Sequence, residues 1–262
     1  MIGGHGYLGR HIKKKLNKKF IILGSKNKKK LNILNINTLN NYIDKNLYCI
    51  INLAGQISNN VKKINYTGSA NIIKITKKKK IQPLLIFFST TLAKNYKKKK
   101  RKKENLLQKY IEAKLNTEKL IKKNYSNFII IRISNVYDEK FEKKGIFKNI
   151  IKSITKNEIL TINNIYSHRN YINIKDVIFH LLNILIKPKK KLIGKTITLA
   201  NENFNIKSII NLFEKKFKKK INMINLKTKL NKDYSQKIYD DTSKYTGLKN
   251  KFNLRKTLKN YR

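Results

Sequence analysis

Four glycines fall within the first nine residues, Met1-Ile-Gly-Gly-His-Gly-Tyr-Leu-Gly9, and an amphipathic segment follows them directly. Their spacing fits G-x-G-x-x-G counted from Gly4, or G-x-x-G-x-x-G counted from Gly3. Residues without a Cβ atom allow the backbone to approach a pyrophosphate closely, and the helix that follows points its unpaired N–H groups toward that anion. Glycine clusters also form ordinary turns, so this motif alone does not decide the function.

Apolar segments of strand length alternate with helical segments along the first half of the chain. We expect strands at 20–23, 31–36, 49–53, 83–88 and 128–131, and helices at 10–18, 65–76 and 105–123. The stronger strands are apolar throughout rather than alternating, which is typical of a parallel sheet covered by helices on both faces. The pattern therefore predicts an α/β, doubly wound domain over residues 1–138, with returning segments near 159–187.

The second half of the chain is less regular. We expect helices near 146–155, 175–187 and 205–219, and short strands near 159–162, 196–199 and 221–226. This predicts a smaller lobe, mainly residues 139–262, that is interleaved with the end of the first domain. A central first strand should carry about five residues, yet two precede the glycine turn. Either this strand begins upstream, or half of it has been lost.

The net charge is +48, and six arginines among the 62 basic residues leave 56 lysines. An excess of lysine, asparagine and isoleucine without tryptophan is typical of an AT-rich coding sequence. We therefore favour compositional drift over selected binding of nucleic acid or another polyanion. A field of this strength would still attract an anionic substrate.

The single cysteine, Cys49, lies in an apolar run, which excludes a disulfide framework and predicts a buried strand cysteine in a reducing cytoplasm. No apolar run approaches the roughly 18 residues of a membrane span, and the turn at Gly3 leaves no room for a signal or transit peptide. Metal-ligand spacing is absent among the four histidines, His5, His11, His168 and His180. We predict a cytoplasmic protein without a membrane segment or a bound metal.

Tyr110 and Lys114 stand four residues apart in an expected helix and therefore share one face. An ammonium group beside a phenol favours the phenolate and lowers its pKa, which produces a base that works near neutral pH. The same spacing also arises by chance on a surface helix of a chain with 14 tyrosines and many lysines. A hydroxyl cluster, Ser89-Thr90-Thr91, precedes this pair at the end of an expected strand.

Taken together and in this order, the motifs resemble the extended short-chain dehydrogenase/reductase family, which contains nucleotide-sugar epimerases, dehydratases and reductases. The resemblance covers nearly the whole chain and implies a Rossmann-like fold with a small interleaved C-terminal substrate lobe. Beyond the glycine turn it rests on Asn52-Leu-Ala-Gly55, Asn65-Tyr-Thr-Gly-Ser-Ala-Asn71, Ser89-Thr90, Tyr110-Ile-Glu-Ala-Lys114 with Glu118, Arg132-Ile-Ser-Asn-Val-Tyr137, Arg169-Asn-Tyr-Ile-Asn-Ile-Lys-Asp176 and Asp241-Thr-Ser-Lys244.

The resemblance implies hydride transfer between a nicotinamide and a sugar bound as its nucleoside diphosphate. It assigns proton exchange with the sugar oxygen to Tyr110 and a bond to the nicotinamide ribose to Lys114. A second bond to the same sugar oxygen falls to Thr90, or to Thr91 if the register shifts by one. Contacts with the substrate fall to Asn135 and, for its phosphates, to Arg169. Besides Tyr110 and Lys114, the cofactor contacts fall to Gly3, Gly6, Tyr7, Leu8, Gly9, Ser25, Lys26, Asn35, Ile36, Leu53, Ala54 and Gly55.

Departures from the family pattern bear on the cofactor and the reaction. Ser25-Lys26 stand where NAD-type relatives carry a carboxylate, which favours NADP over NAD because a hydroxyl and a cation suit its 2′-phosphate. Thr91-Leu92, rather than the acidic pair of the dehydratases, follow Thr90, which disfavours dehydration. A second phosphate-binding arginine has no clear counterpart, and Lys229 or Lys232 would have to replace it.

We therefore expect an NAD(P)-dependent nucleotide-sugar epimerase or keto-sugar reductase that forms a homodimer through the segments 65–76 and 105–123. An epimerase would hold NAD through both half reactions, whereas a reductase would release NADP at each turnover. The alternative is a non-catalytic protein with a dinucleotide fold that binds RNA or another polyanion through its lysine-rich surface. In that case binding would fall steeply with salt, and Tyr110→Phe would be harmless.

Overall fold

The computed structural model describes residues 1–16, 32–55, 57, 60–96, 105–141, 145–186, 190–226 and 237–261. The chain divides into two compact units. Unit 1 comprises Met1–Ile133 and Asn183–Ile197, and unit 2 comprises Ser134–Leu182 and Thr198–Arg262. The chain therefore returns to unit 1 for one segment before unit 2 is complete, which is an interleaved order.

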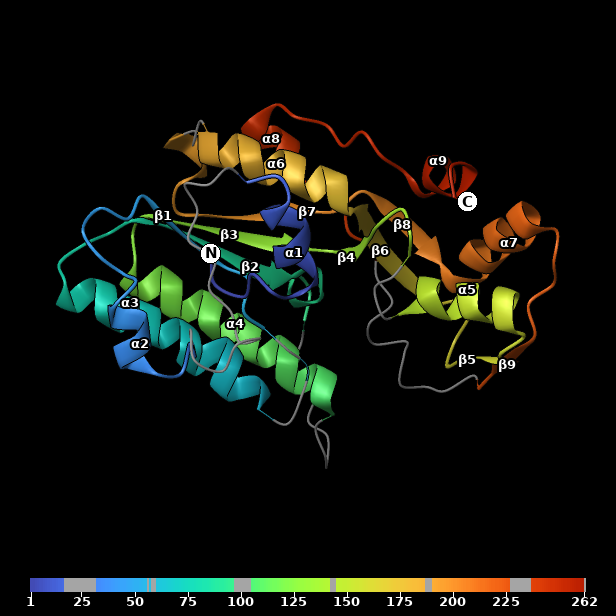
Figure 1. The fold of residues 1–262 in the computed structure, drawn as a ribbon, viewed down its shortest axis with the longest axis horizontal. Coiled ribbons are helices and arrows are strands. Elements are labelled where there is room, and N and C mark those ends of the chain that lie inside the picture. Colours follow the sequence, from blue (N-terminus) through green and yellow to red (C-terminus); the bar gives the residue numbers. More distant parts are fainter. Residues whose placement is uncertain are drawn as a thin grey trace. The chain divides into compact units, whose positions relative to one another are not determined.

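A parallel sheet with strand order β1-β2-β3-β7 forms the centre of unit 1 (Figure 1). Its strands are β1 (Cys49–Asn52), β2 (Leu84–Thr90), β3 (Phe128–Ile133) and β7 (Lys195–Leu199). Ile86 of β2 stands between Ile51 of β1 and Ile129 of β3 in the register, and these three side chains are buried. Continuous burial explains why the strands are apolar at successive positions. Cys49 itself is half-buried.

The two residues ahead of the glycine turn add one parallel bridge to the sheet, between Ile2 and Asn52. The Ile2 N–H donates to the Ile51 carbonyl at 2.8 Å, and the Leu53 N–H donates to the Ile2 carbonyl at 3.0 Å. This pairing places the turn that follows Ile2 beside the carboxyl end of β1.

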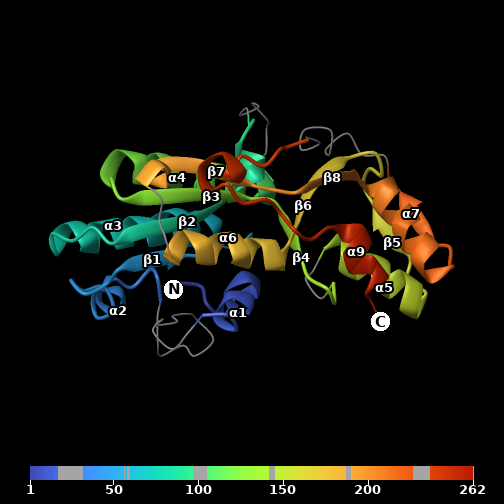
Figure 2. The ribbon, with the colours of Figure 1, turned by 90° about the horizontal axis from the view of Figure 1, so that it is seen from above.

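Helices α3 (Gly68–Lys78) and α4 (Leu106–Asn124) lie side by side on one face of this sheet, and α1 (Tyr7–Lys13) lies on the other (Figures 1 and 2). A capping box starts α4, in which Asn105 and Gln108 each accept a hydrogen bond from the other's backbone N–H. Shorter elements are α2 (Ile36–Asn40), the π-helix η1 (Lys63–Thr67), and the 3-10 turns η2 (Thr91–Ala93) and η3 (Lys190–Leu192).

The strand expected at 31–36 is wrong for the described residues of that range, which form a turn and the start of α2. Asn32 accepts a hydrogen bond from the Leu34 N–H at 2.9 Å, and Asn35 caps α2 by accepting from the Asn37 and Thr38 N–H groups. Asparagine side chains offer the backbone a partner that a strand would not, and here they prevail over the apolar pattern. The expected strand at 20–23 lies outside the described residues.

Unit 2 contains two small sheets. In the first, β6 (His168–Asn173) is parallel to β4 (Asn135–Tyr137) and antiparallel to β8 (Glu202–Asn205). In the second, β5 (Leu160–Ile162) is parallel to β9 (Met223–Asn225). The helices are α5 (Ile146–Lys156), α6 (Ile174–Ile186), which begins in this unit, α7 (Ile206–Phe217), α8 (Thr242–Thr246) and α9 (Leu254–Lys259). The sequence did not predict β4, β6 and β8, because polar residues interrupt all three.

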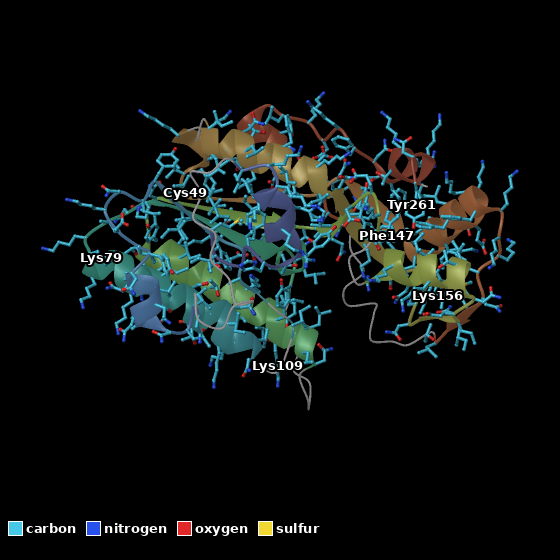
Figure 3. The ribbon with its side chains drawn as sticks, viewed as in Figure 1. Cys49, Lys79, Lys109, Phe147, Lys156 and Tyr261 are labelled. Carbon is cyan, nitrogen blue, oxygen red and sulfur yellow. The ribbon has the colours of Figure 1, made fainter. Side chains whose placement is uncertain are left out.

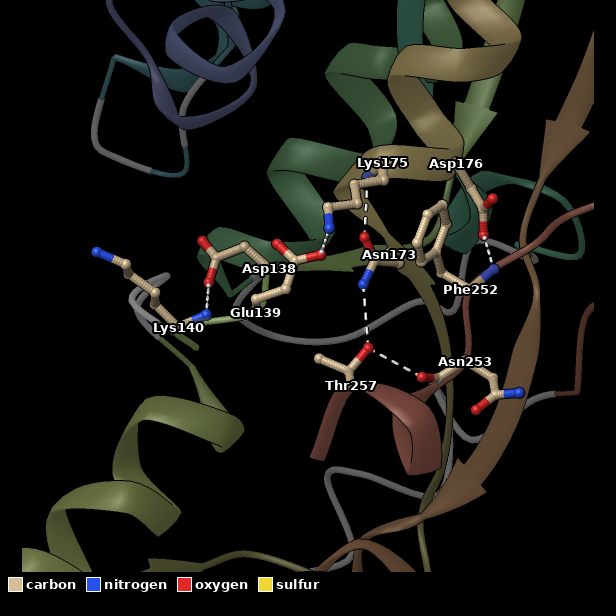
Figure 4. A network of polar contacts seen from close by, with 9 residues as sticks. All are labelled: Asp138, Glu139, Lys140, Asn173, Lys175, Asp176, Phe252, Asn253 and Thr257. Atoms are coloured by element: carbon tan, nitrogen blue, oxygen red, sulfur yellow. Dashed lines mark hydrogen bonds and ion pairs between the residues drawn. The ribbon is translucent and has the colours of Figure 1, made fainter. Parts of the chain in front are cut away.

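Buried polar side chains fasten the C-terminal segment of unit 2, residues 237–261. Asp176 accepts hydrogen bonds from the backbone N–H groups of Lys251 at 2.8 Å and Phe252 at 3.1 Å. Asn173 donates to the Thr257 hydroxyl at 3.2 Å (Figure 4). Because much of this segment is irregular, side chains supply the partners that a regular element would provide.

Aromatic rings fill the core of unit 2. The Phe141 ring centroid lies 5.2 Å from that of Phe147, 5.3 Å from that of Phe213 and 5.5 Å from that of Tyr261. Pairs of this kind stabilise a fold by about 0.5–1.5 kcal/mol beyond the burial of their area. Tyr261, which follows α9, therefore packs into the core of this unit.

No helix among the described residues is long and apolar enough to cross a membrane. Lysines stand on the surface of both units, as Lys109 of α4 and Lys156 of α5 illustrate (Figure 3). At these two positions the excess charge is carried by solvated side chains.

Candidate active site

The glycine turn packs closely against the end of β1. Gly3 has a φ of +80°, which favours glycine, and a Cβ atom added there would come within 2.9 Å of the Ala54 nitrogen. A Cβ atom on Gly9 would lie 2.5 Å from the Gly4 Cα and 2.6 Å from the Gly3 oxygen. Gly6 is the exposed cap from which α1 starts. At Gly3 and Gly9 the backbone of the turn therefore lies too close to neighbouring backbone atoms to leave room for a side chain.

Half-buried Tyr7 and Leu8 form the first turn of α1. Asn35 and Ile36, the residues expected near the adenine, lie at the start of α2, where the Asn35 side chain serves as the cap. Ser25 and Lys26, on which the choice between NAD and NADP depends, lie outside the described residues.

Lys114 brings a buried amine to the carboxyl ends of two strands. Its side chain is 3% exposed, and its Nζ donates to the Phe88 carbonyl at 2.9 Å and to the Ala54 carbonyl at 3.4 Å. A Cβ atom added to Gly55 would lie 2.9 Å from this Nζ and 2.7 Å from the Asn65 Oδ1. The structure therefore brings Lys114 together with the segment Leu53–Gly55, against which Gly3 also packs.

Tyr110 precedes Lys114 by one turn of α4 and is half-buried. The Lys114 Nζ lies 5.9 Å from the centre of its ring. Burial raises the pKa of Tyr110 to about 12. Burial also lowers the pKa of Lys114 to about 7, an effect that the charge of Glu118 opposes.

The pKa of Tyr110 therefore lies above the ordinary value of a phenol, because burial outweighs any lowering by Lys114. Desolvation thus favours the neutral form of the phenol.

The three hydroxyls at the end of β2 have different surroundings. The Thr90 Oγ1 accepts a hydrogen bond from the Leu92 N–H at 3.3 Å, and Thr91 is buried at the start of η2. The Ser89 hydroxyl donates to the Glu118 Oε1 at 2.5 Å. The Ser89 hydroxyl is thus bound to a side chain of α4, and Thr90 is the last residue of β2.

A pocket of about 240 Å³ in unit 2 is lined by both Asn135 and Arg169. The parallel register of β4 and β6 sets Asn135 beside Tyr171, two residues beyond Arg169. Arg169 donates to the His168 carbonyl at 2.9 Å, and burial lowers the pKa of its guanidinium. Aromatic side chains form the remaining walls together with aliphatic ones, and they include Tyr137, Phe141, Phe147 and Tyr171.

Phe141 occupies this pocket wall with a φ of +50°, a left-handed backbone that is rare for a bulky residue. It is 2% exposed, and the rings packed around it hold it in place. Strained positions of this kind gather at ligand sites, because packing around them maintains a shape that the backbone alone would not adopt. An aromatic wall beside a guanidinium suits a ligand with a flat ring and a negative charge.

Three residues beside Lys114 were not among those we expected in the site. Glu118 and Arg132 form an ion pair of 2.6 Å next to Ser89, and Asn65 lies in the π-helix η1 against Gly55. The position of Glu118, four residues after Lys114, was a signal that it shares the same helix face. A π-helix has no comparable signature, so the sequence offered no sign of how Asn65 is placed.

Among the described residues, no cluster of three or more His, Cys, Asp or Glu side chains is arranged to hold a metal ion. The chemistry of the region is instead that of an amine, a phenol and hydroxyls at the ends of parallel strands, which is where α/β folds bind their ligands.

The model of the NAD dependent epimerase/dehydratase family matches residues 1–200. No curated protein sequence matches the chain. Solved structures with a similar fold include UDP-glucuronic acid 4-epimerase from Bacillus cereus in complex with UDP-glucuronic acid and NAD, dTDP-glucose 4,6-dehydratase from Bacillus anthracis in complex with NAD, and RMD from Pseudomonas aeruginosa complexed with NADPH.

The epimerase is 20% identical with a TM-score of 0.80, and the match covers 99% of this chain and 96% of the other. The dehydratase is 16% identical with a TM-score of 0.79 and coverages of 99% and 93%. RMD is 15% identical with a TM-score of 0.75 and coverages of 98% and 95%. These similarities establish the doubly wound α/β fold over essentially the whole chain.

Proposed function

We propose that this chain, which belongs to the NAD-dependent epimerase/dehydratase family, is an NAD(P)-dependent epimerase or keto-sugar reductase acting on a nucleoside-diphosphate sugar. The observation that carries the proposal is the placement of Lys114. Its buried amine donates to the Ala54 carbonyl, just after β1, and to the Phe88 carbonyl, near the end of β2, and it lies one helical turn from Tyr110. An apolar side chain would pack equally well in this position and would cost less desolvation, so packing alone does not explain a lysine here.

The residues present fit a dinucleotide. Gly55 is exposed, and a Cβ atom there would lie 2.9 Å from the Lys114 Nζ, so the missing side chain leaves space beside the amine for a ligand hydroxyl. The turn from Gly3 to Gly9 would hold the pyrophosphate through backbone N–H groups, with Tyr7 and Leu8 in the first turn of α1. Ser25, Lys26, Asn35 and Ile36 would contact the adenosine half, and Leu53, Ala54 and Gly55 the part nearer the nicotinamide.

A bound nicotinamide would accept or supply the hydride. Tyr110, protonated at neutral pH, is suited to give its proton to a sugar ketone, with Thr90 donating to the same oxygen. Removing a proton from a sugar hydroxyl needs a phenol of lower pKa, and a fully charged Lys114 would provide that. The charge of this lysine therefore governs how readily Tyr110 accepts a proton from a sugar hydroxyl.

Asn135 and Arg169 would hold the sugar nucleotide. The guanidinium of Arg169 suits the phosphates, and the aromatic walls of the pocket suit a flat ring. The NAD complex of the similar epimerase and the NADPH complex of RMD support either cofactor. We propose NADP as the preferred form, on the basis of Ser25-Lys26 alone.

The test is to incubate the protein with dinucleotide and UDP-glucuronic acid, UDP-glucose or dTDP-glucose, and to follow reduced nicotinamide and the sugar product. An epimerase would release stoichiometric NAD on denaturation and form an isomeric sugar without net reduction. A reductase would consume NADPH with a 4-keto sugar nucleotide. Absence of hydride transfer, together with equal UDP affinity of wild type and Arg169→Ala, would contradict the assignment to nucleotide sugars.

We also propose a homodimer formed through α3 and α4, by analogy with relatives of the resembled family. Exposed lysines such as Lys109, Lys119 and Lys122 stand on α4. Because like charges on two copies repel and salt screens them, the dimer should strengthen as ionic strength rises. Sedimentation velocity at low and high salt measures this, and a monomer under both conditions would remove the proposal.

A further inference from the structure

A buried carboxylate on α4 is held from two strands. Glu118 is 2% exposed. Its Oε1 accepts hydrogen bonds from the Ser89 hydroxyl at 2.5 Å and from the Arg132 Nε at 3.0 Å, and its Oε2 accepts from a terminal nitrogen of Arg132 at 2.6 Å. The bidentate arginine and the hydroxyl fix both oxygens of the carboxylate.

The partners of Glu118 stand side by side in the sheet, because Ser89 of β2 is paired in register with Arg132 of β3. Phe88, the residue just before Ser89, supplies the carbonyl to which Lys114 donates. Two consecutive residues of β2 are therefore bound by two residues of α4 that lie one turn apart. The carboxylate thus sets the height and rotation at which α4 presents its lysine to the strand ends.

We propose that Glu118 is a positioning residue for Lys114, and that its carboxylate, fixed by Ser89 and Arg132, keeps the lysine charged and seated at the ends of β1 and β2. The significance of this role for catalysis rests on the proposed function. The effect on Lys114 itself does not depend on it.

Among the described groups that face Lys114, Glu118 is the one that carries a negative charge. From α4 come Tyr110 and Glu118. From β2 come the Phe87 ring, 4.6 Å from the Nζ, and the Phe88 carbonyl. The end of β1 contributes the Ala54 carbonyl, and η1 contributes the neutral side chain of Asn65, beside Gly55. Arg132 is the nearby cation, and Glu118 neutralises it directly.

The sign of the electrostatic effect follows from these neighbours. Burial lowers the pKa of Lys114 to about 7, and the Glu118 charge is the cause that raises it. Removing that charge should lower the pKa further. At any pH near neutrality the lysine would then be charged in fewer molecules.

Glu118→Gln tests the proposal, because glutamine preserves the shape and removes the charge. In protein labelled with ¹³C-lysine, the Lys114 signal is identified by its absence in Lys114→Met. Exposed lysines titrate near 10.4, so a signal titrating near 7 is separable. We expect its midpoint to fall in Glu118→Gln and to remain unchanged in Glu112→Gln, which removes a half-buried carboxylate from the same helix. An unchanged midpoint in Glu118→Gln would overturn the proposal.

Glu118→Asp is the second variant, and it retains the charge. Its midpoint should stay near that of wild type, whereas an equal fall in both variants would show that lost packing, not lost charge, moves the titration, and would overturn the proposal. This comparison also decides the matter if Glu118→Gln does not fold, since a large fall in Glu118→Asp alone contradicts the proposal in the same way.

Dinucleotide affinity measured across pH 6–9 connects the result to the proposed function. If binding needs charged Lys114, each unit by which the midpoint falls should weaken affinity at high pH by about tenfold in Glu118→Gln, with convergence at low pH. A wild-type protein that binds no dinucleotide would end the proposed function. The titration of Lys114 would still decide whether Glu118 positions it.

Discussion

Tyr110→Phe should lower kcat by about 10²–10⁴-fold, the range usual for loss of a positioned acid or base. The centre of the Tyr110 ring lies 5.9 Å from the Lys114 Nζ on the same helix, and a phenylalanine ring fills the same space without the hydroxyl. Because the Lys114 amine and the glycine turn are untouched, and phenylalanine keeps the ring that would contact the cofactor, dinucleotide affinity should remain close to that of wild type. Steady-state kinetics and a dinucleotide titration on the same preparation measure both quantities.

Tyr96→Phe is the matched control for this prediction. Tyr96 donates its hydroxyl to the Glu112 Oε1 of α4 at 3.1 Å, so the control also removes a phenol that contacts this helix. It should leave kcat unchanged. Equal turnover in Tyr110→Phe and wild type would mean that Tyr110 is not the proton donor, and would favour a non-catalytic protein with a dinucleotide fold.

Gly9→Ala should weaken dinucleotide binding by about 5–150-fold. The new methyl group would lie 2.5 Å from the Gly4 Cα and 2.6 Å from the Gly3 oxygen, and both neighbours are backbone atoms. Overpacking against atoms that cannot rotate away costs about 1–3 kcal/mol of folding free energy. The turn relieves this strain by leaving the geometry that binds the pyrophosphate, so binding must repay the same amount, at about tenfold in affinity for each 1.4 kcal/mol. The strain falls on the turn that we propose to hold the pyrophosphate.

Ile12→Val separates this effect from a general loss of stability. Ile12 is fully buried in the same helix, and the substitution should lower the free energy of unfolding by about 0.5–1.5 kcal/mol. It should not change dinucleotide affinity, because the turn keeps its shape. Thermal unfolding and isothermal titration of both variants distinguish the two cases. Equal affinities in Gly9→Ala and Ile12→Val would show that the turn does not contact the ligand.

The elements that could be predicted from sequence are those whose pattern reflects burial. β2 and β3 are apolar at successive positions because helices cover both faces of their sheet, and α4 is periodic because one side of it packs. Elements defined by hydrogen bonds of polar side chains could not be predicted. The side chains of Asn32 and Asn35 stabilise a turn and a helix start in a stretch whose apolar pattern predicts a strand. The polar residues of β6 interrupt the apolar pattern by which a strand is predicted.

The site follows the same division. Helical spacing alone was enough to place Tyr110 and Lys114 on one face of α4. The distance of 5.9 Å between the Lys114 Nζ and the centre of the Tyr110 ring agrees with this prediction. Their acidities were not predictable, because they depend on burial from residues that are distant in sequence. The catalytic, cofactor and substrate roles of the residues stay predictions, and so does the division of the chain into a cofactor domain and a substrate domain.

The most direct test of the central claim is a titration of the purified full-length protein with NADH and NADPH, followed by nicotinamide fluorescence, alongside Lys114→Met. We predict saturable binding of one dinucleotide per chain, with tighter binding of NADPH, and strong weakening in Lys114→Met because the amine at the ends of β1 and β2 is lost. Failure of both dinucleotides to bind, or equal affinity in wild type and Lys114→Met, would contradict the account.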